Sequence, residues 1–328
     1  EVPYEIHWVR HYDFATINLN IFSFSNVLGP LAEKEKFDVI HGNAEEAYWT
    51  GKIAKRNKST YVFTSHTPDI PITGMLKGMM RPIRLLKSLN TYLLRQAIRE
   101  ADQVVAFSHF SRDLIMKGIN NTCANKIQVI SPGVESSWFE VERKPSSGSA
   151  LLFWGRIEEE KGLRELFHAL KTVSKIIKDV SLTIVGEGNR LREYKSLVAD
   201  LSLTDRVEFT GWLCSSKIQN LTARSSLGIF PSRVESFGLS VVEAMGAGLP
   251  VIAASGGAVP ENIEQGVTGT LVPVNDADAL ARAIIFILEN VQHAESMAKA
   301  AKIVVQQKFT WDKAANKMID LYELHSDM

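Results

Sequence analysis

The sequence predicts an α/β protein with two doubly wound, Rossmann-like domains that face each other across a cleft. Short runs rich in β-branched and aromatic residues alternate with longer helical patterns, which is typical of parallel sheets covered by helices. A polar stretch, V-E-R-K-P-S-S-G-S at residues 141–149, interrupts this alternation near the middle of the chain. We therefore expect an N-terminal domain at residues 1–145, a C-terminal domain at residues 146–308 and a final helical segment at residues 309–328.

The predicted strands are short and are separated by helical patterns. Those of the first half are residues 4–9, 37–41, 60–65, 103–108 and 126–130. Those of the second half are residues 150–153, 180–185, 206–209, 227–230, 250–253 and 269–272. The last segment is predicted to be an amphipathic helix that Thr310 caps. Its apolar residues at roughly helical spacing are Trp311, Ala315, Met318, Ile319 and Leu321.

The composition, the charge and the cysteine positions exclude several classes of protein. The 328 residues are 45% hydrophobic and 23% charged, as in globular proteins, and the formal net charge of +0 gives no reason to expect nucleic acid binding. Cys123 and Cys214 lie far apart without Cys or His neighbours at ligand spacing, so we expect neither disulfides nor a metal site. No apolar run approaches the ~20 residues that span a bilayer, and the first residues lack the pattern of a signal peptide. A cytoplasmic location is expected.

The most specific segment is E-S-F-G-L-S-V-V-E-A-M-G-A-G-L at residues 235–249. Its turn opens a helix, and the backbone N–H groups and the positive end of the helix dipole suit a phosphate. Glu235 precedes the helix and Glu243 lies about two turns into it, so both carboxylates can face one cleft and accept hydrogen bonds from hydroxyls. Vicinal hydroxyls are typical of sugars, and the segment therefore favours sugar transfer over an ordinary helix cap.

A second segment, G-R-I-E-E-E-K-G at residues 155–162, follows the first predicted strand of the C-terminal domain. The ends of parallel strands are where ligands bind in open α/β sheets. Arg156 offers a fork for two phosphate oxygens and Lys161 a compact charge, so the pair can neutralise a diphosphate without a metal. The alternative is a solvated cation pair beside the acidic residues 158–160.

Two later strand ends carry glycines. Gly186 and Gly188 lie in G-E-G-N-R-L, which begins like a dinucleotide fingerprint but has Leu191 in place of the third glycine. These glycines let a backbone approach a phosphate or ribose, or they make an ordinary turn. Gly211 and Trp212 follow the next strand and are candidates to line a nucleobase pocket.

In the first half, polar groups follow three predicted strands, at residues 41–43, 65–67 and 108–111. His66 is the preferred active-site candidate, because its imidazole can hydrogen-bond a sugar hydroxyl or a phosphate oxygen. His109 is a second candidate for the same role. The alternative for either residue is a structural hydrogen bond.

Residues 75–99 form a basic amphipathic segment. Lys77, Arg81, Arg84, Lys87, Arg95 and Arg99 occur there without an acidic residue and between apolar side chains. Such a segment can lie on an anionic membrane, at about 1 kcal/mol per basic residue, or can be an ordinary half-buried helix. The ordinary helix is the favoured interpretation. The alternative is peripheral contact of residues 75–99 with the cytoplasmic membrane face, which would suit a membrane-associated acceptor.

Together these motifs resemble glycosyltransferase family 4, the retaining group 1 enzymes of the GT-B fold. The motifs of the second half match in order and spacing: G-R-I-x-x-x-K-G, G-E-G, F-T-G, P-S-R-x-E-S-F-G-L-S-x-x-E-A-M-x-x-G-x-P-V-I-A and G-x-x-G-x-L-V. A looser resemblance runs through F-D-V-I-H-G, T-S-H-T and V-I-S-P-G-V in the first half. The W-D-K helix at the end is similar to the family's segment that crosses back to the N-terminal domain.

The resemblance implies a role for each candidate. Arg156 and Lys161 would hold the donor diphosphate, together with the amides of Phe237, Gly238 and Leu239. Glu243 would bind the ribose hydroxyls of a nucleotide-sugar donor and Glu235 those of the transferred hexose. No cofactor or metal is expected, and the acceptor would be a hydroxyl of a glycan, glycolipid or saccharide.

The family's first strand, its glycine-rich turn and its second strand are expected to be missing here. The N-terminal domain would then be incomplete and would begin at the third strand, residues 4–9. A smaller departure is Asn43, where relatives carry a second histidine. Two alternatives therefore stay open beside the transferase: a truncated, non-catalytic nucleotide-sugar-binding protein and a GT-B-fold sugar-nucleotide epimerase. An oxidoreductase is disfavoured because no complete dinucleotide fingerprint follows a strand.

Overall fold

The computed structural model describes residues 34, 37–43, 47–66, 92–119, 124–144 and 149–323. The chain divides into two compact units. Unit 1 comprises residues 1–130 and 316–328, and unit 2 comprises residues 131–315. The unit boundary thus lies at residues 130 and 131, ahead of the polar stretch at residues 141–149.

Unit 2 contains a six-stranded parallel sheet in the order β10-β9-β8-β5-β6-β7. The strands are β5 (Ala150–Trp154), β6 (Ser181–Val185), β7 (Val207–Gly211), β8 (Leu227–Phe230), β9 (Val251–Ala254) and β10 (Thr270–Val272). The chain first moves from β5 outward to β7, then returns to β8 beside β5 and moves outward in the other direction to β10. This is the doubly wound order, with its switch point between β5 and β8.

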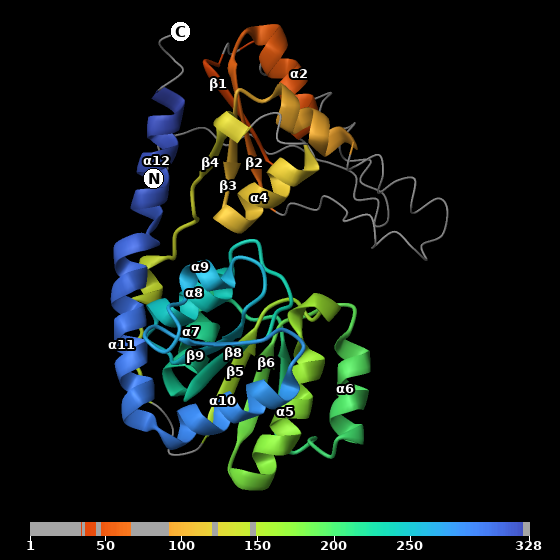
Figure 1. Cartoon of the computed structure of the whole chain (residues 1–328), viewed down its shortest axis with the longest axis vertical. Helices are drawn as coiled ribbons and strands as arrows, with labels where there is room; N and C mark the ends of the chain where they lie inside the picture. The colour runs from red at the N-terminus through yellow and green to blue at the C-terminus, as the bar shows by residue number, and fades with distance from the viewer. Residues whose placement is uncertain are drawn as a thin grey trace. The chain divides into compact units, whose positions relative to one another are not determined.

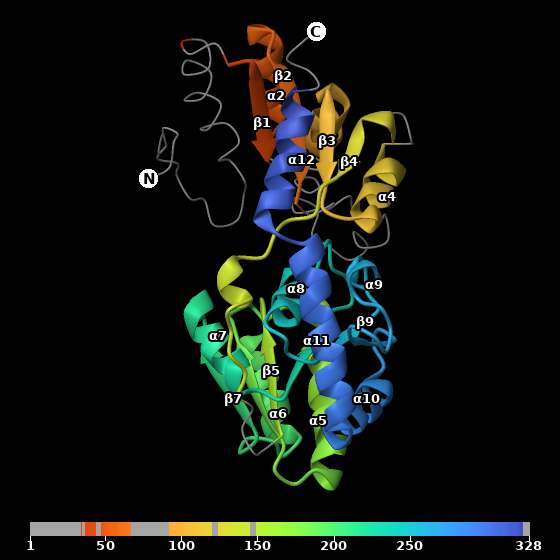
Figure 2. The ribbon, with the colours of Figure 1, turned by 90° about the vertical axis from the view of Figure 1, so that its left-hand side faces the viewer.

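Helices cover both faces of this sheet (Figures 1 and 2). They are α5 (Leu163–Ile176), α6 (Leu191–Asp200), α7 (Ser215–Arg224), α8 (Leu239–Gly246), α9 (Val259–Asn262), α10 (Ala277–Glu289) and α11 (Val291–Lys308). Helix α5 packs against α6 and α10 on one face, and α11 packs against α8 on the other. Because both faces are covered, the central strands are apolar throughout, and Leu151, Leu152 and Phe153 of β5 are at most 1% exposed.

Unit 1 contains a four-stranded parallel sheet in the order β1-β2-β3-β4 among the described residues. Its strands are β1 (Val39–Asn43), β2 (Thr60–Ser65), β3 (Gln103–Ala106) and β4 (Ile127–Val129). The helices α2 (Ala47–Asn57), residues 92–100 and α4 (His109–Gly118) connect them. The predicted strand at residues 4–9, and with it the expectation of an incomplete N-terminal sheet, lies outside the described residues.

Helix α12 (Trp311–Glu323) begins in unit 2, and its residues from Asn316 onward belong to unit 1. Thr310 caps it, since its hydroxyl accepts a hydrogen bond from the backbone N–H of Lys313 at 3.4 Å. In unit 1 the hydroxyl of Tyr322 lies 2.6 Å from Nδ1 of His41, whose Nε2 lies 2.7 Å from the hydroxyl of Thr64. Burial and then the nearby His66 lower the pKa of His41 to about 4, so the imidazole is neutral.

The predicted final helix is confirmed as α12, although most of its apolar side chains are not buried. Trp311 and Ile319 are 53% and 48% exposed, and Leu321 is the buried residue among the helix positions that the structure describes. The polar contact between Tyr322 and His41 joins the helix to the sheet of unit 1. Across the described residues, no helix combines the length and apolarity that a bilayer-spanning segment needs.

Gly162, between the short 3₁₀ helix η4 (Glu159–Lys161) and α5, sets how closely the segment after β5 approaches the segment after β8. Its φ is +67°, and a Cβ atom there would lie 2.0 Å from the carbonyl oxygen of Pro231. Gly266 has a similar φ of +74° but has open space where a Cβ would lie. The two glycines therefore separate the cost of backbone strain from the cost of a steric clash.

We predict that Gly162→Ala lowers the free energy of unfolding by about 3 kcal/mol or more, from left-handed strain plus overpacking. Gly266→Ala should cost only about 1 kcal/mol, because strain alone remains. Urea unfolding followed by tryptophan fluorescence measures both. Equal losses in the two variants would contradict the close approach at Pro231.

Candidate donor-binding site

The predicted diphosphate-binding and hydroxyl-binding residues of the second half lie in the segments that follow β5 and β8, at the switch point of the unit 2 sheet. The segment after β5, residues 155–162, carries Arg156 and Lys161. The segment after β8, residues 231–238, carries Glu235 and leads into α8, which carries Glu243. We call these two segments the β5 arm and the β8 arm.

Neighbouring strand ends hold the β5 arm in place. The backbone N–H of Gly155 donates to the carbonyl of Val185 at 3.0 Å, and that of Ile157 donates to the carbonyl of Glu187 at 2.8 Å. A Cβ at Gly186 would lie 2.0 Å from the carbonyl oxygen of Gly155, so only glycine permits this approach. The segment after β6 therefore supports the arm that carries the two candidate phosphate-binding cations.

The β8 arm is supported by the turn that follows β9. A Cβ at Gly257 would lie 2.2 Å from the carbonyl oxygen of Glu235, and the backbone N–H of Ala258 donates to that same oxygen at 2.9 Å. The side-chain amide of Asn262, which is 6% exposed, donates to the carbonyl of Phe237. The arm is thus fixed by backbone contacts ahead of α8.

Gly238 is the N-cap residue of α8, with φ at +87° and no side-chain cap. Phe237 is buried and Leu239 is 44% exposed. A helix start without a capping side chain leaves N–H groups for a ligand anion, and the dipole favours negative charge there. The predicted phosphate contacts of Phe237, Gly238 and Leu239 stay predictions consistent with this geometry.

The two arms are joined by an ion pair between Lys161 and Glu235. Lys161 Nζ lies 2.6 Å from Glu235 Oε1, and the two side chains are only 14% and 21% exposed. Burial to this degree weakens solvent screening, so the pair holds the arms together more firmly than a surface ion pair does. It also leaves the second carboxylate oxygen of Glu235 for another donor.

Glu243 reaches the β5 strand by a different contact. The indole N–H of Trp154, the last residue of β5, donates to Glu243 Oε2 at 2.9 Å. Burial raises the pKa of Glu243 to about 7, with the Trp154 hydrogen bond lowering it and the charge of Glu135 raising it further. Both predicted carboxylates therefore contact the β5 side of the switch point.

Arg156 is the most exposed member of the predicted set. Its guanidinium lies 3.3 Å from Glu160, and the side chains are 70% and 38% exposed. A pair this exposed is held weakly, so Arg156 can leave Glu160 for a phosphate at little cost.

The acidic residues of the β5 arm have defined partners. Glu158 accepts a hydrogen bond from the backbone N–H of Asn189 at 3.2 Å. Glu159 lies 3.1 Å from Arg233 and 3.5 Å from Arg190. Their charges are therefore directed at these groups rather than at Lys161.

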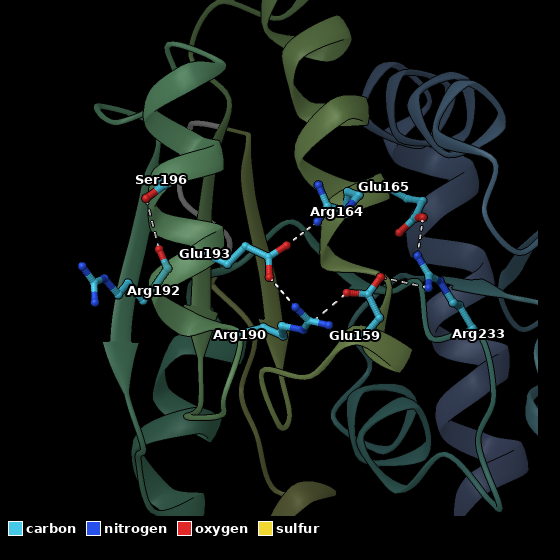
Figure 3. Close-up of polar contacts among 8 residues, drawn as sticks. All are labelled: Glu159, Arg164, Glu165, Arg190, Arg192, Glu193, Ser196 and Arg233. Carbon is cyan, nitrogen blue, oxygen red and sulfur yellow. Dashed lines mark hydrogen bonds and ion pairs between the residues drawn. The ribbon is translucent and has the colours of Figure 1, made fainter. Parts of the chain in front are cut away.

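Arg233 joins the arms a second time. Its guanidinium contacts Glu159 on the β5 arm and, at 2.8 Å, Glu165 in the first turn of α5. Figure 3 shows the continuation of this network, in which Arg190 lies between Glu159 and Glu193 and Glu193 also pairs with Arg164. The loop after β8, the β5 arm and helices α5 and α6 are thus linked by one chain of ion pairs, which we call the Arg233 network.

The remaining candidates of the second half lie farther along the sheet. Gly188 packs against the β5 arm, since a Cβ there would lie 2.2 Å from the carbonyl oxygen of Ile157. Gly211 ends β7, and its φ is +74°. Trp212 is 71% exposed and offers an open aromatic surface. A role for these residues in a nucleotide pocket stays a prediction.

In unit 1 the three predicted polar strand ends come together in part. His66, which is exposed, has Nε2 3.0 Å from Oδ1 of Asn43, the last residue of β1, and its ring packs edge-on against Phe107 after β3. His109 is the first residue of α4, whose N-cap is Ser108. The catalytic role of His66 and the role of His109 stay predictions.

Most of the basic segment at residues 75–99 lies outside the described residues. Its described part, residues 92–99, is helical.

Sequence reasoning missed two residues that the structure places at this site. In the sequence, Trp154 has the pattern of an ordinary apolar strand residue, and Arg233 that of a solvent-exposed cation in a loop. Neither has a local signal, because their partners lie 89 and 74 residues away in the sequence. Within the described ranges, no group of three or more His, Cys, Asp or Glu side chains is arranged to hold a metal.

Comparisons with known proteins agree with this architecture. The family model of glycosyl transferases group 1 matches residues 134–304, and that of glycosyltransferase family 4 matches residues 2–138. A glycosyltransferase of Methanocaldococcus jannaschii is 28% identical over 312 residues, which is 90% of this chain and 77% of that protein. A glycogen synthase of Mycobacterium tuberculosis is 30% identical over 231 residues, or 69% of this chain and 55% of that protein.

Among solved structures, HepE of Anabaena in complex with UDP-glucose superposes with a TM-score of 0.78. Its sequence identity is 22%, and the match covers 92% of this chain and 82% of that one. This likeness shows the fold, and the predicted α/β class with GT-B architecture is confirmed. Since the group 1 model matches more than half of the sequence, the chain belongs to the group 1 glycosyl transferases.

We predict that ionisation of Glu243 lowers the free energy of unfolding as the pH rises. Its pKa of about 7 in the folded protein exceeds the ordinary 4.5, so the folded state binds a proton that the unfolded state releases between these values. The free energy of unfolding should therefore fall across this window, and E243Q should be more stable than wild type at pH 8 by about 2 kcal/mol.

Urea unfolding of wild type and E243Q at pH 5 and pH 8 tests this directly. The gap between them should be small at pH 5 and largest at pH 8. E208Q is the matched control, because Glu208 is an exposed carboxylate on β7. A gap of the same size at both pH values would contradict the raised pKa of Glu243.

Proposed function

We propose that the protein transfers a hexose-type sugar, with retention at the anomeric carbon, from a nucleotide-diphosphate sugar to a hydroxyl of a glycan, glycolipid or saccharide. Unit 2 would hold the donor. The single observation that supports this most is the 2.6 Å contact of Lys161, the proposed diphosphate-binding cation, with Glu235, the proposed hydroxyl-binding carboxylate.

Each group has a distinct task in this proposal. Lys161 and Arg156 neutralise the diphosphate, and the amides at the start of α8 add N–H donors. Glu235 uses its second oxygen to accept hydrogen bonds from hydroxyls of the transferred sugar. Glu243 does the same for the ribose.

The chemistry follows from where charge develops. As the bond between the anomeric carbon and the phosphate oxygen breaks, negative charge grows on the departing diphosphate. Cations that are already in place stabilise this charge more than they stabilise the ground state, which lowers the barrier. We propose that His66 of unit 1 supplies a further hydrogen bond to a sugar hydroxyl or a phosphate oxygen, since it is exposed at a strand end.

UDP is the first nucleotide to test, because the structure of HepE contains UDP-glucose. The competing proposal of a nucleotide-sugar-binding protein without activity shares the donor site and differs in turnover. The competing epimerase differs in product, because it would convert a nucleotide sugar in the absence of an acceptor. One set of binding and product assays therefore separates the three.

We predict that calorimetric titration with UDP, GDP and ADP shows binding of one nucleotide, and that Lys161→Ala weakens this binding by about tenfold or more. The reason is the loss of a charge-assisted contact to the diphosphate. Lys171→Ala is the matched control, since Lys171 is exposed on α5, and it should leave the dissociation constant unchanged.

An unchanged dissociation constant in Lys161→Ala would contradict the diphosphate site. Binding that persists without any sugar transfer, across several acceptors, would support the binding protein instead. Conversion of the donor without acceptor would support the epimerase.

We also propose that the acceptor lies at an anionic membrane surface, on the basis of the basic residues within 75–99. The probe is vesicles of phosphatidylcholine with about 30 mol% phosphatidylserine, because this fraction of anionic lipid gives a clear surface potential. Co-sedimentation should be strong at low salt and weaken as salt screens the charges. Equal recovery with neutral vesicles would contradict the proposal.

A further inference from the structure

The last residue of strand β5 is a tryptophan, whose side chain carries an N–H donor that an aliphatic or phenylalanine side chain lacks. Trp154 is 5% exposed, and a buried indole N–H needs an acceptor. The acceptor here is the carboxylate of Glu243, at 2.9 Å, rather than a backbone carbonyl. The hydrogen bond connects the central strand directly to the residue that the proposed function assigns to the ribose.

The indole cannot turn away from this carboxylate. Its face stacks on Trp138, with ring centroids 5.6 Å apart and planes at 8°. Its other contact is edge-to-face with Phe230, the last residue of β8, with centroids 4.8 Å apart and planes at 86°. The direction of the N–H is therefore set by packing before any ligand arrives.

This arrangement gives the two carboxylate oxygens of Glu243 different roles. Oε2 is occupied by the indole N–H, and Oε1 keeps its lone pairs for a ligand. A carboxylate without the indole contact can rotate about its last bond and offers its oxygens in several orientations. A vicinal diol, by contrast, requires acceptors in one orientation.

We propose that Trp154 is a positioning residue of the donor site: its indole N–H fixes the Glu243 carboxylate so that the free oxygen accepts from the ribose hydroxyls. This inference rests on the proposed function, because it needs Glu243 to bind ribose. It assigns to Trp154 the recognition of ribonucleotides over nucleotides that lack these hydroxyls. Packing alone would not require this residue, since a phenylalanine ring can also fill a buried aromatic position.

The test is Trp154→Phe, which keeps an aromatic ring in the stack and removes the N–H. Calorimetry measures the dissociation constants of UDP, GDP and ADP and of their 2′,3′-dideoxy counterparts. In wild type, loss of the two hydroxyls should weaken binding of the preferred nucleotide by about tenfold or more. In Trp154→Phe this ratio should fall to about a third of its wild-type value or less, because the carboxylate is no longer oriented.

Trp138→Phe is the matched control for packing. It alters the same stack but leaves the hydrogen bond between Trp154 and Glu243. Its ribose-to-dideoxy ratio should match that of wild type even where its thermal midpoint falls. An equal loss of the ratio in both variants would overturn the role of the N–H and assign the effect to packing.

The other outcomes separate this inference from the proposed function. A wild-type ratio that persists in Trp154→Phe would overturn the positioning role alone and leave the donor site intact. Wild-type binding without discrimination between the two nucleotides would overturn the ribose role of Glu243, and this inference with it. Absence of any nucleotide binding would overturn the proposed function itself.

Discussion

The reversal of the strand order between β5 and β8, which are parallel neighbours, is the constraint on which the candidate site depends. The chain moves outward from β5 to β7 and then, from β8, outward on the other side to β10. The segments that follow β5 and β8 therefore diverge at one edge of the sheet and leave their polar groups facing each other. Lys161 comes from one segment and Glu235 from the other, so their contact is a property of the topology rather than of either motif.

Differences in exposure among the ion pairs decide how the site can respond to a ligand. The pair of Arg156 and Glu160 is 70% and 38% exposed and contributes little, so the guanidinium is free to exchange its partner. The pair of Lys161 and Glu235 is 14% and 21% exposed, and separating its members would leave charges poorly solvated. Lys161 and Glu235 are therefore expected to meet a donor as one unit, with Arg156 as the group that moves.

The sequence predicts the strands well because their signal is local. The runs at residues 60–65 and 227–230 match β2 and β8 residue for residue, since short apolar runs that alternate with longer helical patterns are typical of buried parallel strands. The helix α12 also has a local signal, because its apolar residues recur at roughly helical spacing, but this spacing does not show which of them are buried. Trp154 and Arg233 could not be predicted, since their contacts exist only in the folded sheet.

The buried carboxyl of Glu243 lowers the stability of the folded protein. Burial raises its pKa to about 7, so ionising this carboxyl in the folded protein costs free energy that an exposed carboxyl would not require. An apolar residue would remove this penalty but could not accept a hydrogen bond from a hydroxyl. The indole N–H of Trp154 offsets part of the cost by stabilising the anion, and the same contact gives the carboxylate one orientation. Stability and donor recognition therefore compete at Glu243, and Trp154 is the neighbour that reduces the conflict.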